Sequence, residues 1–206
     1  MVKAVVILVA LAALAASGAA RAESLSGSVL INALRQGGYV ILMRHASSPR
    51  TPPAAGDADL DNIKLERQLD ETGRDTARAM GEALKTLRIP IGQVWSSPTY
   101  RALETVRLAA LPTPKTAVEL GDGGQNMQAA AASQAAWLRS KVADPPRAGT
   151  DTIIVTHLPN IMAVFGQSVS GLADGEALIL RPDGEGGAQI VGRAKIEDWP
   201  VLAAQP

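Results

Sequence analysis

The stretch YVILMRHASSP, residues 39–49, leads from an apolar run into a basic and polar segment. Five consecutive apolar or aromatic residues, 39–43, are typical of a strand that is buried on both faces of a sheet. Arg44 and His45 follow this run directly. The strongest other strand pattern, 152–156, ends at His157, so both histidines of the chain stand at the ends of predicted strands.

The rest of the chain alternates between strand patterns and helix patterns. The segment beginning at Thr72 has apolar residues at helical spacing, and Thr72 with Asp75 resembles a capping box. This alternation predicts an α/β fold, a three-layer α/β/α sandwich with a mostly parallel central sheet. We expect strands at 39–43, 91–95, 116–120, 152–156, 176–180 and 189–194, helices at 26–36, 72–88, 98–110, 126–142 and 161–169, and a long loop at 46–65.

Residues 1–22 have the organisation of a secretory signal peptide. Lys3 precedes the apolar run 4–16, and Ala20-Arg21-Ala22 supplies a small-x-small cleavage site. A membrane anchor is the alternative, but the run is shorter than the roughly 20 residues that span a bilayer. We therefore expect cleavage after Ala22 and a mature domain at 23–206. That domain would be periplasmic or secreted, without stable membrane insertion.

Composition narrows the classes of partner. Lys and Arg total 20, as do Asp and Glu, and cleavage would remove two basic residues and no acidic one, leaving a formal charge of −2. No basic excess is present to attract nucleic acid or anionic membranes. The chain has no cysteine. The two histidines have no cysteine or acidic cluster beside them, so we expect no metal site and no cofactor.

The strand ends suggest a chemistry. Ligand sites of α/β sheets form beyond the carboxyl ends of the strands, where Arg44, His45 and His157 are expected, with Arg101 in the first turn of a following helix. Guanidinium groups match phosphate oxygens, and a neutral imidazole can form a covalent phosphoryl intermediate. Two histidines and two arginines at one edge therefore favour a site for a phosphoryl group.

Three segments, in order, resemble the histidine phosphatase superfamily (branch 1), which has the phosphoglycerate mutase-like fold. LMRHASSP resembles its Arg-His-Gly signature, with Ala46 where Gly is usual; WSSPTYRALETVRLA resembles its Arg-Ala-x-x-Thr segment; and VTHLPNI resembles the segment of its second histidine. The resemblance spans about residues 38–169. It implies that His45 is the nucleophile, that Arg44 and Arg101 bind phosphoryl oxygens, that His157 stabilises the transition state, and that Ser48 is a further phosphate contact.

The general acid is left open by the resemblance. Members often carry a carboxylate after the third strand, where this chain reads TAVELGDGG, residues 116–124. Asp122 is the first choice and Glu119 the second, although Asp-Gly-Gly is also an ordinary turn pattern. Glu104, three residues after Arg101 on a predicted helix, is expected to pair with Arg101 or Arg107 instead.

These features lead to a functional hypothesis with alternatives. The sequence is expected to encode an exported phosphomonoesterase that works through a phosphohistidine. It resembles small periplasmic members that act on envelope phosphosugars such as lipopolysaccharide heptose phosphate. A catalytically weak phosphoryl-binding module, or a protein phosphohistidine phosphatase, are the alternatives. The natural substrate, pH optimum and oligomeric state do not follow from the sequence.

Overall fold

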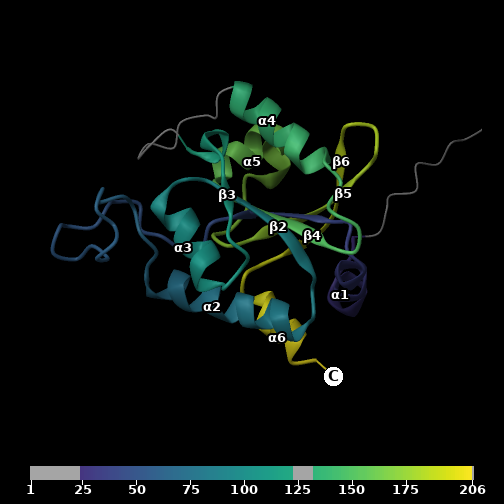
Figure 1. Ribbon diagram of the computed structural model, residues 1–206, viewed down its shortest axis with the longest axis horizontal. Coiled ribbons are helices and arrows are strands. Elements are labelled where there is room, and N and C mark those ends of the chain that lie inside the picture. Colours follow the sequence, from purple (N-terminus) through teal and green to yellow (C-terminus); the bar gives the residue numbers. More distant parts are fainter. Residues whose placement is uncertain (1–23, 123–131, 206) are drawn as a thin grey trace, which may run out of the picture.

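A six-stranded sheet forms the centre of the computed structural model, which describes residues 24–122 and 132–205 (Figure 1). The strand order is β3-β2-β4-β1-β5-β6. The first four strands of this order run parallel, β5 is antiparallel to β1, and β6 is antiparallel to β5, so the predicted mostly parallel sheet is confirmed. The strands are β1 (Val40–Arg44), β2 (Ile91–Ser96), β3 (Lys115–Thr116), β4 (Asp151–Thr156), β5 (Ala177–Pro182) and β6 (Ala188–Ala194).

Helices cover both faces of the sheet. They are α1 (Gly27–Gln36), α2 (Glu71–Thr86), α3 (Tyr100–Leu108), α4 (Ala132–Ala143), α5 (Leu158–Phe165) and α6 (Asp198–Ala203), with short 3-10 helices η1 (Val118–Leu120) and η2 (Gly166–Val169). Apolar residues of α1, α2, α3 and α6 pack on one face, and those of α4 and α5 pack on the other. Figure 1 shows the two layers above and below the sheet, and the predicted three-layer sandwich is confirmed.

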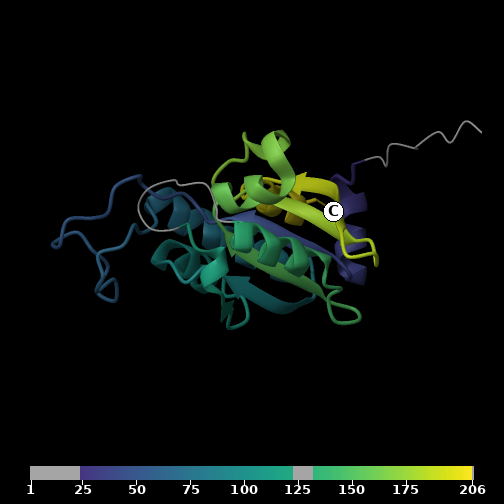
Figure 2. The same cartoon turned by 90° about the horizontal axis from the view of Figure 1, so that it is seen from above.

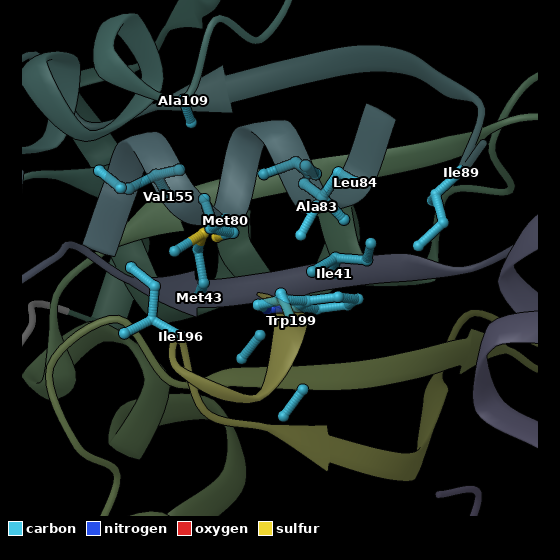
Figure 3. Packing of buried hydrophobic residues seen from close by; sticks show 14 of the residues in the cluster. Ile41, Met43, Met80, Ala83, Leu84, Ile89, Ala109, Val155, Ile196 and Trp199 are labelled. Atoms are coloured by element: carbon cyan, nitrogen blue, oxygen red, sulfur yellow. The ribbon is translucent and has the colours of Figure 1, made fainter. Parts of the chain in front are cut away.

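The central strands owe their apolar sequence to burial on both faces. In β1, Ile41 and Met43 belong to one core cluster and Val40 and Leu42 to the other. Figure 3 shows Ile41 and Met43 packed beneath Met80 of α2 and beside Trp199 of α6. Strand residues alternate between faces, so a strand covered twice needs apolar residues at every position.

Several predicted boundaries were wrong. Helix α2 begins one residue earlier, at Glu71, and its cap is Asp70, whose Oδ1 accepts from the Gly73 N–H at 2.7 Å. Thr72 and Asp75 therefore form no capping box, since Thr72 already lies inside the helix; Asp75 pairs with Arg78. The expected strand at 116–120 is limited to Lys115–Thr116, because the chain turns into η1 and leaves the edge of the sheet.

The remaining differences concern helix ends. Helix α3 begins at Tyr100, after Pro98. Helix α5 begins at Leu158, directly after His157, and α6 was not predicted.

The expected signal peptide at 1–22 and the first part of the expected helix at 126–142 lie outside the described residues. Within the part of the chain that is described, no helix combines the length and the apolar character needed to cross a bilayer.

The segment between β1 and α2 is the long loop predicted at 46–65. It projects from one end of the sandwich in both views (Figures 1 and 2). Its base is tied to the domain, because the Asp70 N–H donates to Ser47 O at 3.2 Å and Ser47 Oγ donates to Asp70 Oδ2 at 2.7 Å. The loop therefore leaves and rejoins the domain beside the carboxyl end of β1.

Candidate active site

The carboxyl ends of three parallel strands meet at one edge of the sheet. Backbone hydrogen bonds tie the residues just beyond them together, from His45 N–H to Thr156 O at 3.0 Å and from Ser97 N–H to Val155 O at 2.9 Å. The rings of His45 and His157 lie with their centroids 5.2 Å apart. The two histidines that the sequence placed at strand ends are thus neighbours in the fold.

His45 presents an unprotonated nitrogen to this edge. Its Nδ1 lies 2.8 Å from Ala46 O, and a carbonyl oxygen only accepts, so Nδ1 carries the hydrogen. The remaining nitrogen, Nε2, has a lone pair and accepts from Arg101 Nε at 3.1 Å. Burial, followed by the nearby Arg101 charge, lowers the pKa of His45 to about 3. The ring is therefore neutral at any working pH and is suited to act as a nucleophile.

Arg101 joins the acidic and imidazole groups of the site. Besides donating to His45, its Nη2 donates to Asp122 Oδ2 and to His157 Nδ1, the latter at 3.2 Å. Its side chain is buried. The guanidinium sits between both rings, where it would meet a phosphoryl group attached to His45.

His157 is held from its other nitrogen. Nε2 lies 2.9 Å from Ser97 Oγ and 3.4 Å from Thr99 Oγ1. Burial, followed by His45 and Arg101, lowers the pKa of His157 well below its usual value. This second ring is also neutral in the substrate-free site.

Asp122 shares the site with the two histidines. Thr156 Oγ1 donates to Leu120 O at 2.8 Å and Asn160 Nδ2 donates to Gly121 O at 2.9 Å, which fixes the turn that carries Asp122. Its Oδ2 contacts Arg101 and lies 3.7 Å from His157 Nδ1. Among the described residues its buried Oδ1 has no hydrogen-bond partner. The carboxylate thus contacts Arg101 at the position where phosphoryl oxygens would bind.

Glu119 and Glu104, the other carboxylates considered from sequence, are placed differently. Within residues 24–122 and 132–205, the half-buried Glu119 side chain has no hydrogen bond or ion pair. Glu104 receives two hydrogen bonds from Arg107, at 2.6 and 2.7 Å, as predicted for a pair on one helix face. Asp122 is therefore the sequence-predicted carboxylate that reaches the histidines.

Arg44 turns toward a carboxylate that the sequence analysis missed. Its Nη2 lies 2.6 Å from Asp174 Oδ1, and its Nη1 donates to Leu172 O at 3.1 Å. Burial raises the pKa of Asp174, although the Arg44 charge opposes this change. A carboxyl whose pKa is raised beside the site is a second candidate proton donor. No local sequence pattern marks Asp174. It is found only because the turn before β5 brings it to Arg44 in the folded chain.

Ser48 and Arg67 connect the site to the long loop. The Ser48 hydroxyl donates to Gln68 O at 2.8 Å, so it holds the loop. Arg67 donates from Nε to Pro49 O at 2.6 Å and from Nη2 to Ser48 O at 3.2 Å. It is 8% exposed, and no ion pair joins it to a carboxylate within the described chain. Arg67 is a third guanidinium of this region that the sequence analysis did not single out.

Ala46, the departure from the glycine of the resembled signature, fits its surroundings. It is fully buried in the apolar core, and its N–H donates to Thr105 Oγ1 at 3.1 Å. Thr105 in turn donates to Arg101 O at 2.8 Å. The threonine of the Arg-Ala-x-x-Thr segment therefore links the residue after the nucleophile to the helix that carries Arg101.

The arrangement combines a neutral nucleophile, cationic donors and carboxyl groups in one buried place. Across residues 24–122 and 132–205, no three or more histidine and acidic side chains gather in a way that could hold a metal ion. Such a set of groups can accept a phosphoryl group on nitrogen and neutralise its charge with arginine.

Comparison with known families agrees with this geometry. Residues 40–123 match the histidine phosphatase superfamily (branch 1). The match covers the segments that carry His45, Arg101 and Asp122. It supports a phosphatase, that is, a hydrolase. No curated protein sequence matches the chain.

Two solved structures illustrate the shared fold. The protein histidine phosphatase SixA complexed with tungstate is 20% identical, with a TM-score of 0.55; the match covers 78% of this chain and 98% of that one. A mutant phosphoserine phosphatase from Entamoeba histolytica, in complex with phosphoserine, is 11% identical, with a TM-score of 0.52 and coverage of 77% and 98%. At these identities the likeness shows the fold.

Proposed function

From the match of residues 40–123 to the histidine phosphatase superfamily, we propose that this chain is an exported phosphomonoesterase that forms a phosphohistidine at His45. In the first step His45 Nε2 attacks phosphorus, the bond to the ester oxygen breaks, and that oxygen leaves with a proton from Asp122. In the second step water attacks the phosphorus, the P–N bond breaks, and the water proton returns to Asp122. Phosphate leaves, and the neutral His45 is restored.

The observation that carries this proposal is the state of His45. The carbonyl of Ala46 fixes the hydrogen on Nδ1, and burial keeps the ring neutral, so Nε2 offers its lone pair beside Arg101. Arg101 must release that lone pair before attack, and a phosphoryl group supplies the stronger acceptors that draw the guanidinium away. When the phosphoryl oxygens bind Arg101, Asp122 has to release the guanidinium, and it must take up a proton before it can act as the acid.

Export and substrate class rest on the sequence. The signal-peptide pattern at 1–22 supports a periplasmic or secreted enzyme, and it makes cytoplasmic phosphosugars poor candidates. Envelope phosphosugars such as lipopolysaccharide heptose phosphate are the proposed substrates. Phosphate release from envelope preparations by the pure protein would support this choice, whereas release only from phosphohistidine peptides would replace it with a protein phosphohistidine phosphatase.

The activity is tested with residues 23–206 and an aryl phosphate in the presence of EDTA. We expect metal-independent phosphate release that falls to background in His45→Ala. Arg78→Ala, which removes an exposed ion pair with Asp75, is the control and should match the wild type. Turnover that survives in His45→Ala would refute the phosphohistidine route.

A second candidate is a phosphoryl-binding module with weak catalysis. The contact between Asp122 and Arg101 favours it, because the site's own carboxylate competes with the phosphoryl group for the guanidinium. This reading predicts that the wild type binds vanadate and releases no phosphate from any ester. Multiple turnovers on one phosphomonoester would exclude it.

A further inference from the structure

Two hydroxyl groups stand behind His157, on the side away from Arg101. Ser97 Oγ lies 2.9 Å from His157 Nε2, and Thr99 Oγ1 lies 3.1 Å from Ser97 Oγ. Ser97 is fully buried, and its N–H donates to the backbone of β4 at Val155. The hydroxyl next to the ring is therefore held in place by the sheet.

The contacts in the structure define one direction for this chain of hydrogen bonds. A guanidinium only donates, so Arg101 Nη2, 3.2 Å away, donates a hydrogen bond to His157 Nδ1. The neutral ring then carries its own hydrogen on Nε2 and donates it to Ser97 Oγ. The Ser97 hydroxyl in turn donates a hydrogen bond to Thr99 Oγ1. The order is Arg101, His157, Ser97, Thr99.

A bound phosphoryl group demands the opposite direction. Its oxygens accept, so His157 must present a hydrogen on Nδ1 in order to contribute to the site. A neutral ring with Nδ1–H has a lone pair on Nε2, and that buried lone pair needs a donor. A hydroxyl can accept in one state and donate in the other.

Building on the proposed function, we infer that Ser97 is a positioning residue that selects the protonated nitrogen of His157, and that the Ser97–Thr99 pair reverses its hydrogen bonds when a phosphoryl group binds. The ring gives up its Nε2 proton to water and takes one at Nδ1. Ser97 keeps one O–H throughout and only changes its direction. No net proton is gained.

Nitrogen NMR can read both states directly, because the chain has only two histidines. In residues 23–206 with ¹⁵N-labelled imidazoles, we expect His45 protonated at Nδ1 and His157 at Nε2. Adding orthovanadate should move the His157 proton to Nδ1. A free protein with His157 protonated at Nδ1, or a vanadate complex with both nitrogens of His157 protonated, would overturn the reversal.

Variants test the role of the hydroxyls. Ser97→Ala should weaken vanadate binding about 10- to 100-fold, because the ring loses its nearer buried hydroxyl and keeps only Thr99 Oγ1, 3.4 Å from Nε2. An unchanged His45 signal would show that the variant is folded. Thr99→Val should have a smaller effect in the same direction, and Thr99→Ser, which keeps the hydroxyl, should restore the affinity.

The outcomes separate this inference from the proposed function. A wild type that turns over phosphate, together with Ser97→Ala that binds vanadate equally well and shows His157 protonated at Nδ1, would refute the role of Ser97 alone. A wild type that neither binds vanadate nor turns over any ester would remove the proposed function, and this inference with it.

Discussion

At the carboxyl ends of β1, β2 and β4, buried polar groups contact one another: Arg101 alone touches His45, His157 and Asp122. At the amino end of β4, the buried carboxyl of Asp151 stands apart. Its Oδ1 accepts from the Tyr39 N–H at 2.9 Å, and its Oδ2 has no hydrogen-bond partner among the described residues. Both edges bury ionisable groups, but only one arranges them to meet a ligand's charge.

The difference teaches that burial of a polar group does not by itself indicate a functional site. Burial raises the pKa of Asp151 to about 7, against the effect of its bond from Tyr39. Within the described part of the chain, Asp151 forms no ion pair, and no charged group is among the causes of its pKa shift. We therefore expect changes at the carboxyl edge to alter activity, and changes at the amino edge to alter stability and its pH dependence.

The largest expected effect follows from replacing Arg101. Arg101→Ala removes the guanidinium that is proposed to bind the phosphoryl oxygens, and charge-assisted bonds are worth about 1.5–3 kcal/mol each. We expect kcat/KM for an aryl phosphate to fall about 10³-fold or more. Measurement of kcat/KM beside vanadate affinity checks this, and both should fall.

Arg181 provides a matched control at the opposite edge. This exposed arginine of β5 donates to the Tyr39 hydroxyl at 3.1 Å and lies over the Tyr39 ring. Arg181→Ala should leave kcat/KM within about twofold of the wild type. Equal losses in the two variants would mean that the edges do not differ in the way proposed.

Much of the carboxyl edge could be predicted from the sequence, for physical reasons. A strand buried on both faces must be apolar throughout, so the runs before Arg44 and His157 stand out. The alternation of strands and helices then brings their ends together. His45, Arg101, Asp122 and His157 meet as expected.

What the sequence did not reveal depends on contacts between distant segments. Asp174 reaches Arg44 through the turn before β5, and Arg67 reaches the site by donating to the carbonyls of Ser48 and Pro49. The cap at Asp70 was missed for a similar reason, since Ser47 helps to hold its carboxylate. The tautomers of the histidines follow from atomic contacts that a sequence pattern does not show, such as that of His45 Nδ1 with Ala46 O.

The next effect in size concerns the amino edge and is an effect on stability. The folded pKa of Asp151, about 7, is raised above its ordinary value of 3.8, so the folded state binds this proton more tightly than the unfolded chain. The stability that this proton contributes is therefore fully present below about pH 4 and is lost as the pH rises through 7. The linkage amounts to about 4 kcal/mol.

Thermal or urea unfolding between pH 4 and pH 8 measures this term. His45 and His157, whose pKa values are lowered, act in the opposite direction in both proteins, so the contribution of Asp151 is the difference between the wild type and Asp151→Asn. We expect Asp151→Asn to gain stability relative to the wild type as the pH rises from 4 to 7, because the amide oxygen can still accept from Tyr39 and no charge forms at high pH. Asp75→Asn, at an exposed position on α2, is the control and should keep the wild-type slope. A difference in stability between the wild type and Asp151→Asn that stays constant between pH 4 and pH 8 would contradict the argument.

The smallest expected effect is on kcat, and it distinguishes the two carboxyl groups of the active site, Asp122 and Asp174. Asp122 touches Arg101 and lies 3.7 Å from His157, whereas Asp174 pairs with Arg44. A general acid matters most when the leaving oxygen is a poor leaving group, and it contributes about 10²-fold or more. We expect Asp122→Asn to lower kcat for an alkyl phosphate about 10²-fold, and much less for a nitrophenyl phosphate.

Asp174→Asn should act on both esters alike, by a factor of about 10 or less. Its amide keeps an oxygen beside Arg44, so the change weakens the placement of that guanidinium, which is proposed to bind the phosphoryl oxygens of either ester. Rates with the two esters, compared for each variant, decide between the carboxyls. If Asp174→Asn shows the ester-dependent loss and Asp122→Asn does not, the proton comes from the carboxyl whose pKa burial raises. Asp122 would then be the residue that keeps Arg101 occupied until a phosphoryl group arrives.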